Sequence, residues 1–197
     1  MKSSFGQRFT LIELLVVIFI IVVLAGMLFP ALGTVRDNAK RSKASSECLA
    51  LKSALVMYES EFSRWPADGT GDARVNSQDD TSNSKTESRD TSKYPEMCEA
   101  LTGSNKKKMI FYEVGVGYEK NKGFLDPWNR QYQVVLDFDF SGTINEEHVS
   151  QINSGLGRST STLNTSVAVY SYGVDGDNKD KTNLTTLAQK KKIVISW

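Results

Sequence analysis

Histidine, cysteine and proline are scarce in this sequence of 197 residues, which contains one histidine, two cysteines and four prolines. The single histidine, His148, lies in a polar stretch, and the sequence has no G-x-S-x-G, H-E-x-x-H or phosphate-binding glycine pattern. The sequence therefore offers none of these catalytic patterns, and we predict that the protein is not an enzyme. The two cysteines, Cys48 and Cys98, allow one disulfide outside the cytoplasm or two buried thiols within it.

An excess of either charge is also lacking, because 24 lysines and arginines face 23 aspartates and glutamates. A balanced chain has no overall field that would attract nucleic acid or an acidic substrate. Two lysine clusters, residues 106–108 and 190–192, could contact phosphates, but they need no role beyond solvated surface charge. No nucleic-acid partner is expected.

A long apolar run is present near the start of the chain. No polar side chain occurs from Leu14 to Phe29, and with its apolar flanks the run covers residues 9–32, enough for the roughly 20 residues that span a bilayer. A cleaved secretory signal would have a shorter apolar centre followed by a small-residue cleavage site, which is absent. The sequence predicts a transmembrane segment.

One carboxylate, Glu13, lies inside this apolar run near its start. Such a group costs about 2.5 to 3.5 kcal/mol at mid-bilayer, so it indicates a function. Residues 8–18, RFTLIELLVVI, resemble the N-terminal signature of type IV pilins and type II secretion pseudopilins. The resemblance implies a cytoplasmic leader, residues 1–8, that prepilin peptidase removes between Arg8 and Phe9, and methylation of the new Phe9 amine.

The same resemblance implies a role for Glu13 in assembly. Cleavage leaves an α-amine on Phe9 with a pKa of about 8, at the membrane depth of Glu13 in a neighbouring subunit. Pairing the two charges relieves both desolvation costs and fixes the stagger between subunits. The expected partners are thus further copies of the chain in a filament, the membrane, prepilin peptidase and the secretion or pilus assembly machinery.

Two features depart from the family pattern. Arg8 occupies the position before the cut, where the family usually has glycine, and Gly6 is two residues too early. Basic residues are also more frequent after the span than before it, which by charge alone favours the opposite orientation. They are Arg36, Lys40, Arg41 and Lys43 after it, against Lys2 and Arg8 before it.

An apolar stripe continues the helix beyond the span. Its members recur at spacings of three and four, and they are Cys48, Leu51, Leu55, Tyr58 and Phe62. We therefore predict one helix from about Thr10 to Ser63, with an assembly part at 9–32 and an amphipathic part at 33–66 that ends at Trp65-Pro66. Pro30 removes a backbone donor and predicts a bend or local opening, which is either passive or involved in assembly.

The rest of the chain divides into a polar surface insertion, residues 67–93, and a globular β domain, residues 94–197. A short helix at 95–101 brings Cys98 to this domain, and β-branched and aromatic residues predict strands at 131–138, 143–145, 166–172 and 192–197. The predicted class is α+β: a long N-terminal helix, with transmembrane and amphipathic halves, packed on a small antiparallel sheet as in the pilin fold.

A second resemblance lies in the C-terminal half. The segments LDPWN at 125–129 and YSYGVDG at 170–176, with Tyr132 and Trp197, look like the C-terminal part of the major pseudopilins of type II secretion. Insertions at 68–92 and 146–164 depart from the compact family pattern.

Two loops offer oxygen ligands. Residues 137–144, DFDFSGTI, copy the first half of an EF-hand loop, but His148 occupies the twelfth position and a strand precedes the loop, so a hairpin turn at Ser141-Gly142 is favoured. The second loop contains Asp175, Asp177, Asn178 and Asp180. It is either a polar turn or a calcium site, and the pseudopilin resemblance implies calcium.

These observations favour one function, to which two alternatives remain. We expect a structural subunit of a pilus or pseudopilus for type II protein secretion, anchored by one span in the inner membrane with its C-terminal domain in the periplasm. In that compartment Cys48 and Cys98 are expected to form a disulfide, with two free thiols as the alternative. The rival functions are a type IV pilin for adhesion or DNA uptake and a monomeric membrane-tethered binding module.

Overall fold

The structure is a computed structural model, and it describes residues 10–66, 72–74, 93–113, 117–173, 185 and 193–197; for residues 27–32 and 72–74 only the backbone is described. The chain divides into two compact units, residues 1–39 and residues 40–197.

Helix α1 (Leu11–Phe62) matches the predicted helix to within one residue at each end. It ends where Ser63 takes a positive φ of 52° and its N–H still bonds the carbonyl of Glu59 at 2.6 Å. The helix is continuous through Pro30, so the local opening that this proline predicted is not present. The long, uninterrupted helix of the sequence prediction is confirmed.

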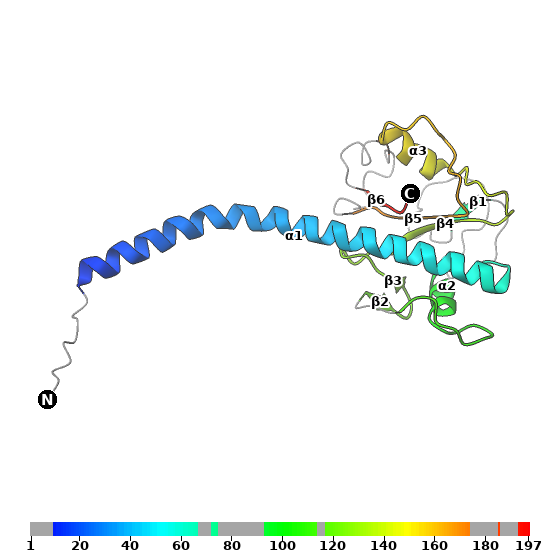
Figure 1. The fold of residues 1–197 in the computed structure, drawn as a ribbon, viewed down its shortest axis with the longest axis horizontal. Coiled ribbons are helices and arrows are strands. Elements are labelled where there is room, and N and C mark those ends of the chain that lie inside the picture. Colours follow the sequence, from blue (N-terminus) through cyan, green and yellow to red (C-terminus); the bar gives the residue numbers. More distant parts are fainter. Residues whose placement is uncertain (1–9, 67–71, 75–92, 114–116, 174–184, 186–192) are drawn as a thin grey trace. The chain divides into compact units, whose positions relative to one another are not determined.

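The main sheet has the order β1-β4-β5-β6, with every neighbouring pair antiparallel. The strands are β1 (Asp72–Arg74), β4 (Gln133–Asp137), β5 (Val167–Ser171) and β6 (Val194–Ile195). Val135 pairs with Ala168, and Tyr170 pairs with Ile195. Three of the predicted strands are therefore present, and the α+β class is confirmed (Figure 1).

One strand was not predicted and one sequence prediction in this region is wrong. Residues 72–74, within the predicted polar surface insertion, form the edge strand β1, whose backbone pairs with β4. Ser141-Gly142 does not join two paired strands, because β4 pairs with β1 and β5. The residue expected to continue that hairpin, Ile144, instead forms an isolated bridge with Leu163.

Helix α2 (Lys93–Leu101) contains the predicted short helix and packs near a small hairpin of β2 (Tyr118–Glu119) and β3 (Gly123–Phe124). The contact between α2 and β3 is so close that it requires a glycine. Gly123 has a φ of +77°, and a Cβ there would lie 2.7 Å from the Cys98 sulfur and 2.7 Å from the Tyr94 ring. Gly123 thus lets the hairpin close against α2.

Both faces of the main sheet are covered in the unit formed by residues 40–197. Val134, Leu136, Val167 and Val169 share a core with α1 and α2. The alternate residues Val135, Ala168 and Tyr170 share a second core with Val149 and Ile152 of α3 (Glu147–Gly155). Figure 1 shows α1 and α3 on opposite sides of these strands. Because alternating side chains of a strand point to opposite faces, strands that are buried on both faces are mostly apolar, as β4 and β5 are between their ends.

Candidate functional site

The start of α1 is closed by a reciprocal pair of side chains, Thr10 and Glu13. Glu13 Oε2 accepts the Thr10 backbone N–H at 2.8 Å and the Thr10 hydroxyl at 2.7 Å. The Thr10 hydroxyl oxygen in turn accepts the Glu13 N–H at 3.3 Å. This is a capping box, in which the residue before the helix and the third helical residue satisfy donors that the helix leaves unpaired. The one carboxylate of the apolar run is therefore held at the helix terminus.

The helix from Leu11 to Leu24 exposes its apolar side chains on every face. Among its large hydrophobic residues the exposed fraction ranges from 40% at Val23 to 83% at Leu11. We call residues 11–24 the apolar segment. A helix that is apolar all round is stable only when other apolar groups surround it. Within this chain the described residues supply no such cover.

No helix in the described part of the chain is both long enough and apolar enough to cross a membrane. The predicted transmembrane segment at 9–32 therefore stays a prediction.

Several predicted site residues lie outside the described residues. They are Arg8 and Phe9 at the predicted cleavage point, and Asp175, Asp177, Asn178 and Asp180 of the predicted calcium loop. At Pro30 only the backbone is described, and it is helical. The predictions of cleavage, methylation and calcium binding are untested by the structure.

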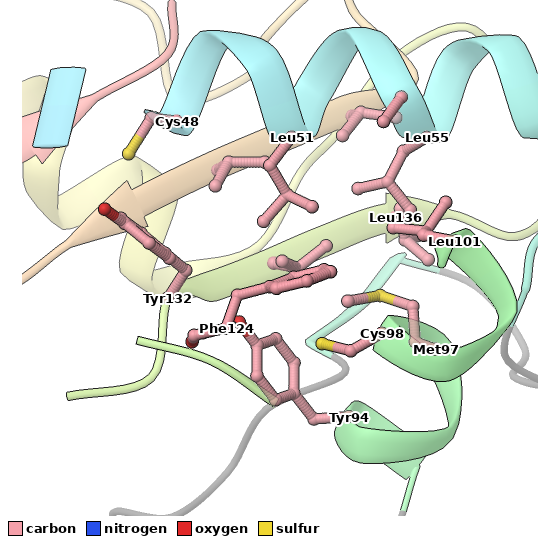
Figure 2. Packing of buried hydrophobic residues seen from close by; sticks show 14 of the residues in the cluster. Cys48, Leu51, Leu55, Tyr94, Met97, Cys98, Leu101, Phe124, Tyr132 and Leu136 are labelled. Atoms are coloured by element: carbon pink, nitrogen blue, oxygen red, sulfur yellow. Dashed lines mark hydrogen bonds between the residues drawn. The ribbon is translucent and has the colours of Figure 1, made fainter. Parts of the chain in front are cut away.

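The second part of α1 buries one face, as its spacing predicts. Cys48, Leu51, Leu55 and Tyr58 are at most 3% exposed, and Phe62 packs at the edge of the same core. Figure 2 shows Leu51 and Leu55 pointing from α1 toward Leu136 of the sheet and Leu101 of α2. The apolar stripe of the sequence is thus the surface on which the globular unit is built.

The predicted disulfide between Cys48 and Cys98 is not present. Both residues are free thiols, fully buried in the same hydrophobic core, which is the alternative that the sequence left open. Burial raises the pKa of Cys98 to about 12. Burial, and then the charges of Asp126 and Glu47, raise the pKa of Cys48 well above its ordinary value. Thiols that stay protonated are unreactive, so both behave as small core residues.

The two C-terminal motifs of the sequence meet through the buried carboxylate of Asp126. Its Oδ1 accepts the backbone N–H groups of Trp128 and Arg130, both at 2.9 Å. Its Oδ2 accepts the Ser171 hydroxyl at 2.5 Å. A buried carboxylate is costly unless such donors surround it. The LDPWN segment and the YSYG segment are therefore one structural feature.

The same network fixes Gly173, the last described residue before the predicted calcium loop. Its N–H donates to the Ser171 hydroxyl at 3.0 Å, and its carbonyl accepts from Arg130 Nη1 at 2.8 Å. From the sequence, both motifs could be identified by resemblance, but no role could be predicted for Asp126, Arg130 or Ser171. A short-range motif cannot show that a partner 45 residues away completes the hydrogen bonds of Asp126.

A further buried carboxylate, Asp137, closes the loop that copies half of an EF-hand. Asp137 accepts the N–H groups of Ser141 at 3.1 Å and Gly142 at 2.7 Å, and Asp139 also accepts the Ser141 N–H at 3.0 Å. Burial, and then Asp139, raise the pKa of Asp137. The loop binds its own amides, and within the described ranges no three histidine, cysteine or acidic residues gather as a metal site.

The end of α1 is tied to the domain by aromatic and charged contacts. Trp65 Nε1 donates to the carbonyl of Asp137 at 2.5 Å, and its ring stacks on Phe140 with centroids 6.1 Å apart. Lys107 pairs with Glu61 and lies 5.5 Å from the centroid of the Phe62 ring. One member of the lysine cluster at 106–108 thus has a structural role.

The helix, its capped carboxylate and the sheet define an α+β protein of the kind that the pilin-like resemblance predicts. Comparison with known proteins gives particular relatives. Each is named Type II secretion system core protein G. The chain is 42% identical over 71 residues to the protein of Pectobacterium carotovorum subsp. carotovorum, which is 36% of this chain and 46% of that one.

Two further relatives carry the same name. The protein of Klebsiella michiganensis is 41% identical over 71 residues, or 36% of this chain and 50% of the relative. The protein of Aeromonas hydrophila is 42% identical over 77 residues, which is 39% of this chain and 54% of the relative. The chain thus spans about half the length of the curated relatives it matches. No family model matches it. No solved structure matches it either.

Proposed function

We propose that this chain is the precursor of a structural subunit of a pseudopilus, similar to the major pseudopilin, that serves type II protein secretion. The observation that carries the proposal is helix α1, which presents an exposed apolar segment with one capped carboxylate and continues into a globular unit. The relatives named Type II secretion system core protein G support the same assignment. We assign the chain no catalytic step.

Processing follows from the N-terminal signature. Prepilin peptidase would remove residues 1–8 and expose the Phe9 amine, which is then methylated. The subunit would remain in the inner membrane through residues 9–32, with the globular unit in the periplasm. Mass spectrometry of the mature protein tests this step: the expected N-terminus is methylated Phe9, and a chain that still carries residues 1–8, or that begins at Gln7, contradicts it.

Assembly would use the apolar segment as the contact between subunits. Glu13 of one subunit would pair with the Phe9 amine of the next, because two opposite charges in a low-dielectric site are stable only together. The pairing would fix the register of the filament more than it adds stability. Purified subunits should form filaments that electron microscopy can image. Subunits that stay monomeric at high concentration would instead favour a membrane-tethered binding module.

Calcium is the proposed ligand of the loop that contains Asp175, Asp177, Asn178 and Asp180. Three carboxylates in one short loop repel one another unless a cation neutralises them. Bound calcium would raise the free energy of unfolding by about 2.7 kcal/mol at a hundredfold excess over the dissociation constant. Thermal unfolding with calcium and with chelator tests this. An equal shift in an Asp177→Ala, Asp180→Ala variant would show that calcium acts elsewhere.

A further inference from the structure

Thr10 donates hydrogen bonds to only one of the two carboxylate oxygens of Glu13. Both bonds from Thr10, one from its backbone N–H and one from its hydroxyl, end on the same oxygen, Oε2. Oε1 takes part in neither bond. An ionised carboxylate can accept about four hydrogen bonds across its two oxygens. Glu13 can therefore cap its own helix and still accept a donor from outside the subunit.

The hydroxyl also restricts the side chain of Glu13. A glutamate has three rotatable bonds, and an exposed one normally samples many rotamers. Here the Thr10 backbone N–H and the Thr10 hydroxyl both donate to Glu13 Oε2, so two bonds hold the carboxylate end of the side chain. The same hydroxyl accepts the Glu13 backbone N–H, which keeps Thr10 itself in place. A side chain that is already ordered loses less entropy when it binds a partner.

We propose that Thr10 is a positioning residue for subunit assembly, which holds the Glu13 carboxylate by Oε2 so that Oε1 accepts the amine of the neighbouring subunit. The proposal rests on the proposed function, in which Glu13 pairs with that amine. It adds that the capping box of the free subunit is kept in the filament. Thr10 touches the pairing group but not the amine.

Three variants isolate the hydroxyl. Thr10→Val keeps the branched shape and the backbone N–H but removes the hydroxyl, whereas Thr10→Ser keeps the hydroxyl. Thr34→Val removes a hydroxyl from an exposed threonine of the same helix and serves as the matched control. If the Glu13 side chain is no longer ordered before it binds, the yield of filaments should fall by about two- to tenfold.

The experiment measures filaments released by shearing from cells that express the full chain. Yield is normalised to mature subunit, counted by mass spectrometry, so that a change in processing does not count as a change in assembly. We expect reduced yield for Thr10→Val and wild-type yield for Thr10→Ser and Thr34→Val. Thermal unfolding of the globular unit should be the same in all of them.

A Glu13→Gln variant, which keeps the shape but not the charge, separates this inference from the proposed function. If Glu13→Gln stops assembly while Thr10→Val assembles as the wild type does, the positioning role of Thr10 is overturned and the charge pairing stands. If Glu13→Gln assembles normally, the pairing is overturned, and the positioning role with it. Equal losses in Thr10→Val and Thr10→Ser would also overturn it, since the hydroxyl would not be the cause.

Discussion

The two parts of α1 differ in how far their apolar side chains are exposed. In the apolar segment, residues 11–24, large hydrophobic side chains are exposed on every side of the helix. From Ala44 to Tyr58 the hydrophobic residues are sorted: Cys48, Leu51 and Leu55 are buried, while Leu49 and Val56 stay exposed. One helix therefore contains a part that packs against other described residues and a part whose side chains are exposed among the described residues.

This difference shows where each part obtains its stability. Isolated helices are marginal in water, so most helices depend on the packing of an apolar face. The part in the globular unit packs on the sheet and on α2. In the proposed function, lipid or other subunits would cover the apolar segment. The capping box supplies hydrogen bonds at the start of the helix from the subunit's own residues.

Truncation of the buried stripe should give the largest effect. Leu51 is 1% exposed, so Leu51→Ala should lower the free energy of unfolding of the globular unit by about 2 to 5 kcal/mol through a cavity. The neighbouring Leu49 is 52% exposed, and Leu49→Ala should change it by less than about 0.5 kcal/mol. Urea unfolding followed by tryptophan fluorescence measures both. Similar losses would contradict the sorting of the two faces.

A charge in the apolar segment should act on anchoring and not on the fold. Ile18→Asp is expected to cost about 2.5 to 3.5 kcal/mol of membrane insertion. Val56→Asp, at an exposed position of the globular unit, should leave insertion unchanged. The fraction of subunit retained in membranes after alkaline extraction reports the difference. Full retention of the Ile18→Asp protein would show that the apolar segment is not in the bilayer.

Within the globular unit, the Asp126 network should be the most sensitive polar feature. Ser171→Ala removes the hydroxyl that donates to Asp126 and accepts from Gly173. Leaving these buried partners unsatisfied should cost about 1 to 3 kcal/mol. Ser154→Ala, on the exposed face of α3, is the control and should have little effect. An unchanged unfolding midpoint for Ser171→Ala would contradict the role given to the network.

The buried thiols give the smallest effect at neutral pH. Without a reducing agent, Cys48 and Cys98 should resist alkylation in the folded protein and both react after denaturation, as intact mass would show. The folded-state pKa of Cys98, about 12, lies above its ordinary value of 9.0. Its contribution to stability is thus complete below about pH 9 and is lost as the pH rises toward 12. Resistance to alkylation after denaturation would indicate a disulfide.

The sequence predicted the parts of this fold whose pattern is local. The spacing of Leu51, Leu55 and Tyr58 defines a helical face whatever lies opposite, and the apolar runs of β4 and β5 are typical of buried strands. Helix α3 was missed because Val149 and Ile152 are its only large apolar buried residues in a polar stretch, and their partners lie on the second face of the sheet. Strand β1 was missed because its three residues, Asp72–Arg74, have no apolar alternation that would indicate a strand.

In the candidate site too, the sequence could identify some residues but not the contacts that they make. Glu13 could be singled out because a carboxylate in an apolar run is rare, but its bond to Thr10 depends on the helix terminus. Asp126 and Ser171 are 45 residues apart in the sequence, and only the folded structure shows that they are bonded to each other. The disulfide prediction was wrong because two cysteines on buried faces of one core need not be directed at each other.

The charge of Glu13 is the feature on which the proposed assembly depends most. The measurement is the yield of sheared filaments, counted by electron microscopy, from cells expressing the wild type or the Glu13→Gln variant at equal levels of mature subunit. Because glutamine keeps the size of the side chain and cannot pair with an amine as an anion, the account predicts normal membrane insertion and no filaments for the variant. Filaments at wild-type yield would contradict it.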